Sequence, residues 1–236
     1  MKTIAFIFAR GGSKGIPNKN LALLDGVSLL ARAITSARKI SSISRVIVST
    51  DDPKIAKHAI DCGAEAPFVR PAELASDTAA EHDAWKHAIT ELRKQGEIFD
   101  TMLVLPATAP LRATRDIEEC LRVFQTPETD IVITVQQSER NPYFNMVVAN
   151  LDGTVRLASN TEDGAFTRRQ DAPAVFDITT VAYVANPDFV MRSKRYFDGR
   201  VRAVEVPRVR AVDIDVPLDL EWAEFLIRKG HPDILA

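Results

Sequence analysis

The chain has 236 residues, with 30 basic and 32 acidic side chains and a formal net charge of −2. Hydrophobic residues make up 46% and charged residues 26%, which is ordinary globular usage and excludes a disordered chain. Nucleic-acid binders normally carry a clear basic excess, so the near-neutral balance argues against that class. The length suits one α/β domain spanning 1–236, with a core of its own.

The two cysteines, Cys62 and Cys120, form no C-x-x-C motif. We therefore expect buried free thiols rather than disulfides or a thiolate metal site. The apolar run at the N-terminus stops at Arg10 without a small-residue cleavage site, which favours a first strand over a signal peptide. No stretch approaches the roughly 20 apolar residues of a membrane helix. We expect a cytoplasmic protein that binds neither membranes nor nucleic acid.

Strand-like and helix-like segments alternate through the first 135 residues. Strands are expected at 3–9, 45–49, 102–105 and 130–135, and helices at 28–39, 53–62, 78–95 and 114–125. This alternation predicts right-handed crossovers and an α/β three-layer sandwich with a mostly parallel, doubly wound sheet. Ligands of such sheets bind beyond the carboxyl ends of the strands.

The pattern changes after about residue 138. The turn dipeptides Asn141-Pro142, Asp152-Gly153 and Asp163-Gly164 separate short segments and predict hairpins. We interpret residues of about 139–175 as an inserted arm that serves dimerisation and substrate binding. The chain then returns with strands at 175–184 and 201–206 and a helix at 217–229.

The loop after the first strand, ARGGSKGIPNKN over 9–20, is the strongest local signal. Its glycines allow close backbone approach to a ligand, and its cations supply positive charge: Gly11, Gly12, Gly15, Arg10, Lys14 and Lys19. The spacing matches neither a P-loop nor the dinucleotide-binding fingerprint. A Gly-rich turn with solvated cations is the alternative, but so many glycines and cations together favour a polyphosphate site.

Polar residues also follow other strands. Ser49, Thr50 and Asp51 end the second strand, and RPAELASDTA over 70–79 leads into a helix. Both sets fall at the ligand-binding edge of the sheet. Capping is an equal alternative for Asp51 at the helix from Pro53, and for Asp77 or Thr78 at the next helix.

The fourth strand ends in LPATAPLR over 105–112, a Pro-stiffened loop in which Thr108 and Arg112 are suited to hold a base or sugar. Near the end of the chain, VDID over 212–215 alternates apolar and acidic residues, which predicts a strand with Asp213 and Asp215 on one face. Two such carboxylates repel unless a cation pairs them, and beside a polyphosphate they suggest Mg²⁺. The alternative is an exposed acidic strand edge.

Six motifs, in order, resemble the acylneuraminate cytidylyltransferase family, the CMP-sialic acid synthetases and their relatives for legionaminic, pseudaminic and similar nine-carbon sugars. They are ARGGSKGIPNKN at 9–20, STD at 49–51, RPAELASDTA at 70–79, TAPLR at 108–112, RRQ at 168–170 and DID with DLEWAE at 213–224. The resemblance implies a nucleotide-diphospho-sugar transferase-like fold and a homodimer with a swapped arm. It also implies Mg²⁺-dependent transfer of CMP from CTP to the anomeric hydroxyl of a nonulosonic acid, releasing pyrophosphate.

The same resemblance implies roles for residues of this chain. The nucleotide site would comprise Arg10, Gly11, Gly12, Ser13, Lys14, Lys19, Asn20, Arg70, Asp77, Ala79 and Thr108. The sugar site would comprise Arg112, Arg169, Gln170 and Tyr183, and the metal site Asp213 and Asp215. Arg10, Lys14 and Asp215 would be catalytic. No general base is evident, because His82 and His87 lie in an expected helix where a structural or solvated role is favoured.

Departures from the family bear on the substrate. ATAP at 107–110 resembles the pseudaminic acid members rather than the sialic acid synthetases, and AEH at 80–82 replaces serines. N-acetylneuraminate is therefore not favoured over other bacterial nonulosonic acids. Two alternative functions are a cytidylyltransferase for another 2-keto sugar acid such as Kdo and a non-catalytic nucleotide-binding module. The DID and RRQ motifs disfavour the first, and Lys14, Asp213 and Asp215 disfavour the second.

Overall fold

The protein is described by a computed structural model over residues 1–159, 166 and 168–235. A six-stranded sheet forms its centre, with the strand order β10-β6-β9-β5-β1-β4. The strands are β1 (Thr3–Phe8), β4 (Ile43–Ser49), β5 (Thr101–Val104), β6 (Ile131–Gln137), β9 (Phe176–Ala185) and β10 (Val201–Glu205). Neighbours run parallel, except that β9 is antiparallel to β5 and β6. The mostly parallel α/β fold predicted from the sequence is confirmed.

The helices also follow the sequence pattern. Those with predicted counterparts are α1 (Leu29–Arg38), α2 (Pro53–Asp61), α3 (Glu81–Lys94), α4 (Thr114–Phe124) and α6 (Pro217–Arg228). Four of them match the predicted ends to within one residue, but α3 begins three residues later than predicted, because Asp77 and Thr78 stay in the preceding loop. Two short helices, α5 (Pro187–Arg192) and α7 (Pro232–Leu235), were not predicted.

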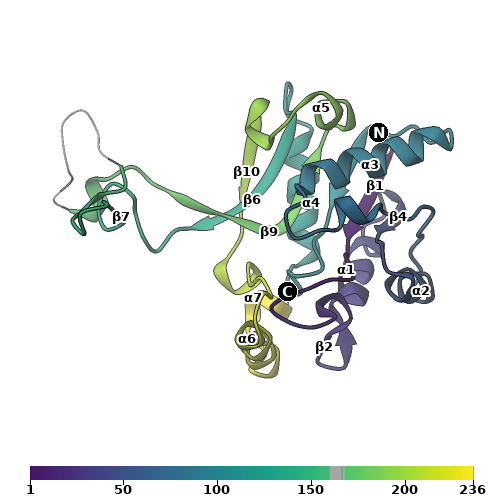
Figure 1. Ribbon diagram of the computed structural model, residues 1–236, viewed down its shortest axis with the longest axis horizontal. Helices are drawn as coiled ribbons and strands as arrows, with labels where there is room; N and C mark the ends of the chain where they lie inside the picture. The colour runs from purple at the N-terminus through teal and green to yellow at the C-terminus, as the bar shows by residue number, and fades with distance from the viewer. Residues whose placement is uncertain (160–165, 167, 236) are drawn as a thin grey trace.

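Two hydrophobic clusters cover the two faces of the sheet. Alternate residues of β1 show the division, since Ala5 and Ile7 join one cluster while Ile4 and Phe6 join the other. The first cluster contains residues of α1, α2, α4 and α6, and the second contains residues of α3 and α5. The predicted three-layer arrangement is therefore present (Figure 1).

Residues following β6 leave the sandwich as an arm, which Figure 1 shows projecting far from the helices. Its hairpin pairs β7 (Val147–Ala149) with β8 (Val155–Leu157). Two predicted turns are confirmed: the Asn141 side chain accepts a hydrogen bond from the Tyr143 N–H at 2.9 Å, and Gly153 has a φ of 84°. The third, at Asp163-Gly164, lies outside the described residues.

Membrane insertion by a helix finds no support in the fold. None of the helices in the described ranges 1–159 and 168–235 is both long enough and apolar enough to span a bilayer.

Candidate active site

A cavity of about 280 Å³ lies at the carboxyl edge of the sheet, between the loop after β1, the segment before α3 and the loop after β5. Seven residues predicted for the nucleotide site line it: Arg10, Lys19, Asn20, Arg70, Asp77, Ala79 and Thr108. The other four, Gly11, Gly12, Ser13 and Lys14, belong to the same loop but do not line the cavity. The structure thus brings three distant sequence motifs to one place.

Hydrogen bonds to the main chain hold the loop after β1. The N–H of Gly11 donates to Oδ1 of Asp51 at 2.9 Å, and Nδ2 of Asn20 donates to the Arg10 carbonyl at 3.0 Å. Asp51 is therefore not the helix cap. That role belongs to Asp52, whose Oδ1 accepts from the Lys54 N–H at 2.7 Å at the start of α2.

Asp77 pairs with two cations of the loop. Its carboxylate lies 2.6 Å from Nη1 of Arg10 and 2.7 Å from Nζ of Lys14. These contacts, with Lys14 the stronger, hold the pKa of Asp77 below its usual range. Neither Asp77 nor Thr78 caps α3, which begins after Ala80 without a side-chain cap.

Arg70 is a buried residue of the cavity lining. It is 5% exposed, and its guanidinium donates to the hydroxyl of Ser49 at 3.1 Å and to the Ser49 carbonyl. The guanidinium also lies 5.4 Å from the centre of the Phe8 ring. Burial lowers the pKa of Arg70 to about 10, which still leaves it charged at neutral pH.

The acidic pair lies beside the same loop. Nζ of Lys19 is 2.8 Å from Oδ1 of Asp215, whose side chain is 70% exposed. The predicted strand at 212–215 is absent. Instead the segment is irregular and is held by the N–H of Ile214, which donates to the Thr108 carbonyl at 2.8 Å. Asp213 and Asp215 are the residues before and after Ile214 in the chain.

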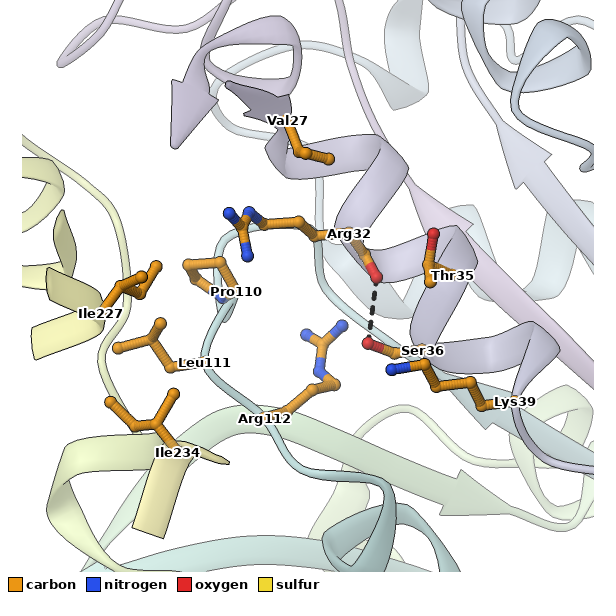
Figure 2. A pocket seen from close by; sticks show the side chains of 10 residues that line it. All are labelled: Val27, Arg32, Thr35, Ser36, Lys39, Pro110, Leu111, Arg112, Ile227 and Ile234. Atoms are coloured by element: carbon orange, nitrogen blue, oxygen red, sulfur yellow. Dashed lines mark hydrogen bonds between the residues drawn. The ribbon is translucent and has the colours of Figure 1, made fainter. Parts of the chain in front are cut away.

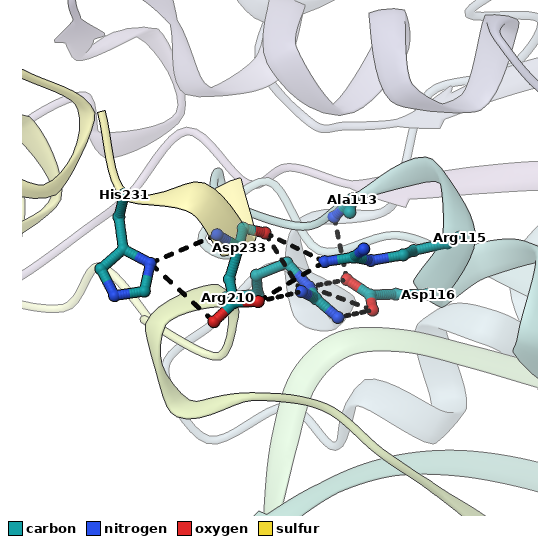
Figure 3. Close-up of polar contacts among 6 residues, drawn as sticks. All are labelled: Ala113, Arg115, Asp116, Arg210, His231 and Asp233. Atoms are coloured by element: carbon teal, nitrogen blue, oxygen red, sulfur yellow. Dashed lines mark hydrogen bonds and ion pairs between the residues drawn. The ribbon is translucent and has the colours of Figure 1, made fainter. Parts of the chain in front are cut away.

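A buried ion pair anchors the start of this segment (Figure 3). Arg210, at the end of the short helix η5 (Arg208–Arg210), is 5% exposed. Its Nη2 and Nε lie 2.8 and 2.9 Å from the two carboxylate oxygens of Asp116 in α4. Its Nη1 donates to the Asp233 carbonyl of α7 at 3.1 Å. The approach of the acidic segment to the cavity is thereby set by α4 and α7.

Asp213 has the features of a metal ligand. Its Oδ1 is buried and has no hydrogen-bond partner among the described residues. Burial, with the nearby charge of Asp215, raises the pKa of Asp213. A divalent cation would satisfy that oxygen and offset the repulsion. Groups of three or more His, Cys, Asp or Glu side chains suited to a metal are absent from the described part of the chain, so phosphate and water would have to complete the coordination.

Four predicted sugar-binding residues lie elsewhere. Arg112 is 7% exposed, donates to the carbonyls of Val181 and Pro106 and does not line the cavity at the sheet edge, so its contact with the sugar stays a prediction. Tyr183 is also buried, with its ring 5.6 Å from that of Trp85. Local pattern could not show that these side chains face the core.

Arg169 and Gln170 lie on the arm, in the short helix η3 (Arg169–Asp171). They line a separate cavity of about 380 Å³ with residues of 137–141 and 172–175. Nη2 of Arg169 donates to the Ser138 carbonyl at 3.0 Å. Within one chain, neither residue lines the cavity at the sheet edge.

Sequence reasoning missed one acidic residue of the site. Glu81 lines the cavity and accepts a hydrogen bond from the Tyr196 hydroxyl at 3.0 Å. The only sequence signal for Glu81 was that AEH at 80–82 replaces the serines of the family pattern. The structural role favoured for His82 is confirmed, since its Nε2 lies 3.1 Å from the Val190 carbonyl. His87 packs its ring edge-on against Phe68.

Comparison with known proteins gives the family. A family model described as Cytidylyltransferase matches residues 4–229. Post-translational flagellin modification protein B of Campylobacter coli is 35% identical, over 95% of this chain and 94% of that protein. A CMP-N,N'-diacetyllegionaminic acid synthase of Campylobacter jejuni is 33% identical, over 94% and 93%. A pseudaminic acid cytidylyltransferase of the same species is 29% identical, over 98% of both.

Solved structures agree in fold. A CMP:2-keto-3-deoxy-manno-octonic acid synthetase complexed with CTP matches with a TM-score of 0.72 at 18% identity, over 98% of this chain and 100% of that one. A 4-diphosphocytidyl-2C-methyl-D-erythritol synthase of Anaerococcus prevotii matches with a TM-score of 0.68 at 14% identity, over 96% and 98%. With a family match over nearly its whole length, the chain belongs to the cytidylyltransferase family of nucleotidyltransferases.

Proposed function

We propose that this chain transfers CMP from CTP to the anomeric hydroxyl of a nonulosonic acid, forming the CMP-sugar and pyrophosphate. The observation that carries this proposal is the contact between a cationic glycine loop and an acidic pair, in which Lys19, a residue of the cavity lining, lies 2.8 Å from Asp215. The names of the relatives, which include legionaminic and pseudaminic acid enzymes, support the sugar class.

The cations of the loop would hold the triphosphate. Arg10 and Lys14 exchange their ion pairs with Asp77 for contacts with phosphate oxygens, and exposed amides of the loop add hydrogen bonds. As the sugar oxygen attacks the α-phosphorus in line, negative charge accumulates on the departing pyrophosphate. Once they have left Asp77 for the phosphates, the two cations are already in place when this charge develops, so Arg10 and Lys14 serve leaving-group stabilisation.

Mg²⁺ fits the acidic pair and, when bound by Asp213 and Asp215, would neutralise charge on the phosphates. The chain's own contribution is the placement of the two carboxylates. The Ile214 bond to Thr108 fixes them beside the loop that lines the cavity. Arg70 and Thr108 at the cavity wall are suited to hold the nucleoside.

The arm would complete the sugar site across a dimer. Arg169 and Gln170 lie away from the cavity of their own chain, so a second copy would have to present them. The arm hairpin exposes apolar side chains, including Val147 at 58% and Val155 at 62%, which a partner copy would cover. Mixing an Arg169→Ala chain with an inactive Asp215→Asn chain should restore activity. No recovery in heterodimers would oppose the arm model.

The proposal is tested by measuring pyrophosphate release with each of the four common ribonucleoside triphosphates, with and without Mg²⁺. The sugars supplied are N-acetylneuraminic, legionaminic and pseudaminic acids and Kdo. We expect turnover with CTP and one or more nonulosonic acids, and only with the metal. Turnover with UTP but not CTP would overturn the nucleotide assignment, and turnover with Kdo alone would favour the eight-carbon alternative. Because CTP is a cytoplasmic metabolite, we place the reaction in the cytoplasm.

A further inference from the structure

A third cavity, of about 420 Å³ and larger than the other two described above, lies between α1, the loop at 110–112 and the two C-terminal helices (Figure 2). It shares no lining residue with the candidate active site. Its volume is within the range of small-molecule sites, roughly 300–1,000 Å³. Nothing in the proposed transfer reaction uses it.

The lining of this cavity is cationic. Arg32 and Lys39 of α1 and Arg112 of the loop reach it, together with the hydroxyls of Thr35 and Ser36, and no carboxylate lines it. Figure 2 shows the amine of Lys39 beside Ser36 and the guanidinium of Arg112 directed toward the same side of α1. Nε of Arg32 already donates to the Leu24 carbonyl at 3.1 Å, and its Nη2 lies 4.0 Å from the Asp25 carboxylate. Lys39 and Arg112 have no ion pair among the described residues, and these two like charges repel each other unless an anion lies between them.

Arg112 strengthens this argument because it is buried without an ion pair. Its Nε and Nη2 donate to main-chain carbonyls, and its Nη1 has no hydrogen bond among the described residues. Two carboxylates, Asp116 and Asp213, act on Arg112 through their charge, but neither forms an ion pair with it among the described residues, and Asp116 is already paired with Arg210. Burial lowers the pKa of Arg112 to about 9. A buried guanidinium without a carboxylate partner is costly, and a bound anion would offset that cost.

The other wall of the cavity is apolar, formed by Leu111 of the loop, Ile227 of α6 and Ile234 of α7. A cavity with one cationic wall and one apolar wall favours a ligand that has both an anionic group and an apolar body. We propose that this cavity is a second ligand site, which takes a small phosphomonoester. Its phosphate contacts Arg32, Lys39 and Arg112, and its uncharged body lies against the apolar wall.

Phenyl phosphate is the probe, titrated by calorimetry at low ionic strength. Lys39→Gln removes an exposed cation of the cavity and should leave the fold intact. The matched control is Lys57→Gln, an equally charged lysine exposed on α2 that lines neither cavity. Losing a charged phosphate contact should weaken binding about tenfold in Lys39→Gln, with little change in Lys57→Gln.

A third variant separates the two cavities. Lys14→Gln weakens the proposed triphosphate site and should leave phenyl phosphate binding at the second site unchanged. Equal affinity in Lys39→Gln and wild type, or a loss confined to Lys14→Gln, would overturn the proposal. Inorganic phosphate should bind more weakly than phenyl phosphate. Equal affinities would show that the apolar wall does not take part in binding.

Discussion

Gly15 lies against the main chain of Asp215. A Cβ atom placed on Gly15 would come 2.0 Å from the carbonyl oxygen of Asp215, closer than any real contact. The glycine loop and the acidic segment are therefore in direct backbone contact, although they are separated by some two hundred residues of chain. This contact allows Lys19, in the same loop, to reach the Asp215 carboxylate at 2.8 Å.

Gly15→Ala should force the two segments apart. Because the nearest atom belongs to the backbone, relief requires a main-chain shift, and overpacking of this kind costs about 1–3 kcal/mol. Gly12→Ala is the control for stability, since a Cβ there meets nothing within 4 Å. Urea melts of the two variants compare the free energies of unfolding. Equal free energies of unfolding in the two variants would show that the loop accommodates a Cβ atom at Gly15 without loss of stability.

The predicted elements succeeded where the information is local. The apolar runs of β1 and β4 and the capped helix at Pro53 depend on neighbouring residues, and all three were found within two residues of their predicted ends. The antiparallel insertion of β9 between β5 and β6 depends on pairing between distant segments. No local pattern carries that information.

The candidate site shows the same difference between what local sequence predicts and what depends on distant segments. The cationic loop was predicted residue by residue, but its ion-pair partners were not, because Asp77 and Asp215 lie far along the chain from the cations they meet. Arg112 was predicted to hold a base or sugar because it ends a loop at the sheet edge, and the family resemblance assigned it to the sugar. Its guanidinium instead turns inward to main-chain carbonyls, a direction that composition and spacing do not determine.

Asp215→Asn should remove most of the metal-dependent turnover while the fold persists. The side chain is 70% exposed, so its loss leaves no buried cavity. The neutral amide is a weaker ligand for Mg²⁺ than the carboxylate. The exposed acid Glu221 of α6 provides the control Glu221→Gln, with turnover expected near wild type. Steady-state pyrophosphate release across a Mg²⁺ titration measures both, and normal turnover in Asp215→Asn would exclude this carboxylate from the metal site.

Asp77→Asn should tighten pyrophosphate binding measured without metal. In the free protein Asp77 occupies both Arg10 and Lys14, so an incoming phosphate must displace it. The lowered pKa of Asp77 keeps it charged through neutral pH, and the competition should ease only in acid. Asp83→Asn is the control, an exposed acid of α3 without an ion pair among the described residues. Weaker binding in Asp77→Asn would instead mean that Asp77 contacts the ligand directly.

The ion pair between Asp116 and Arg210 should be a main determinant of stability. Both side chains are nearly fully buried, so Asp116→Asn removes the close charge partner of a buried guanidinium and leaves only the Asp233 carboxylate, 3.9 Å from its Nη1. Breaking a buried pair typically costs about 3–5 kcal/mol. Glu119→Gln, one turn along α4, breaks an exposed pair with Arg122 and should leave stability nearly unchanged. Urea denaturation gives both free energies. Similarly small losses of unfolding free energy in the two variants would show that water takes the place of the Asp116 carboxylate beside Arg210.

Cys120 should behave as a protonated, unreactive thiol. Burial raises the pKa of Cys120 to about 12, whereas the pKa of a cysteine thiol in an unfolded chain is about 8.5. A raised folded pKa contributes stability that is present below the unfolded value and is lost as pH rises toward 12. The difference in unfolding free energy between wild type and Cys120→Ala should therefore shrink from pH 8 to pH 10.5. In the native protein at pH 8, a thiol reagent should modify half-buried Cys62 first, and equal labelling of both cysteines would contradict the buried position of Cys120.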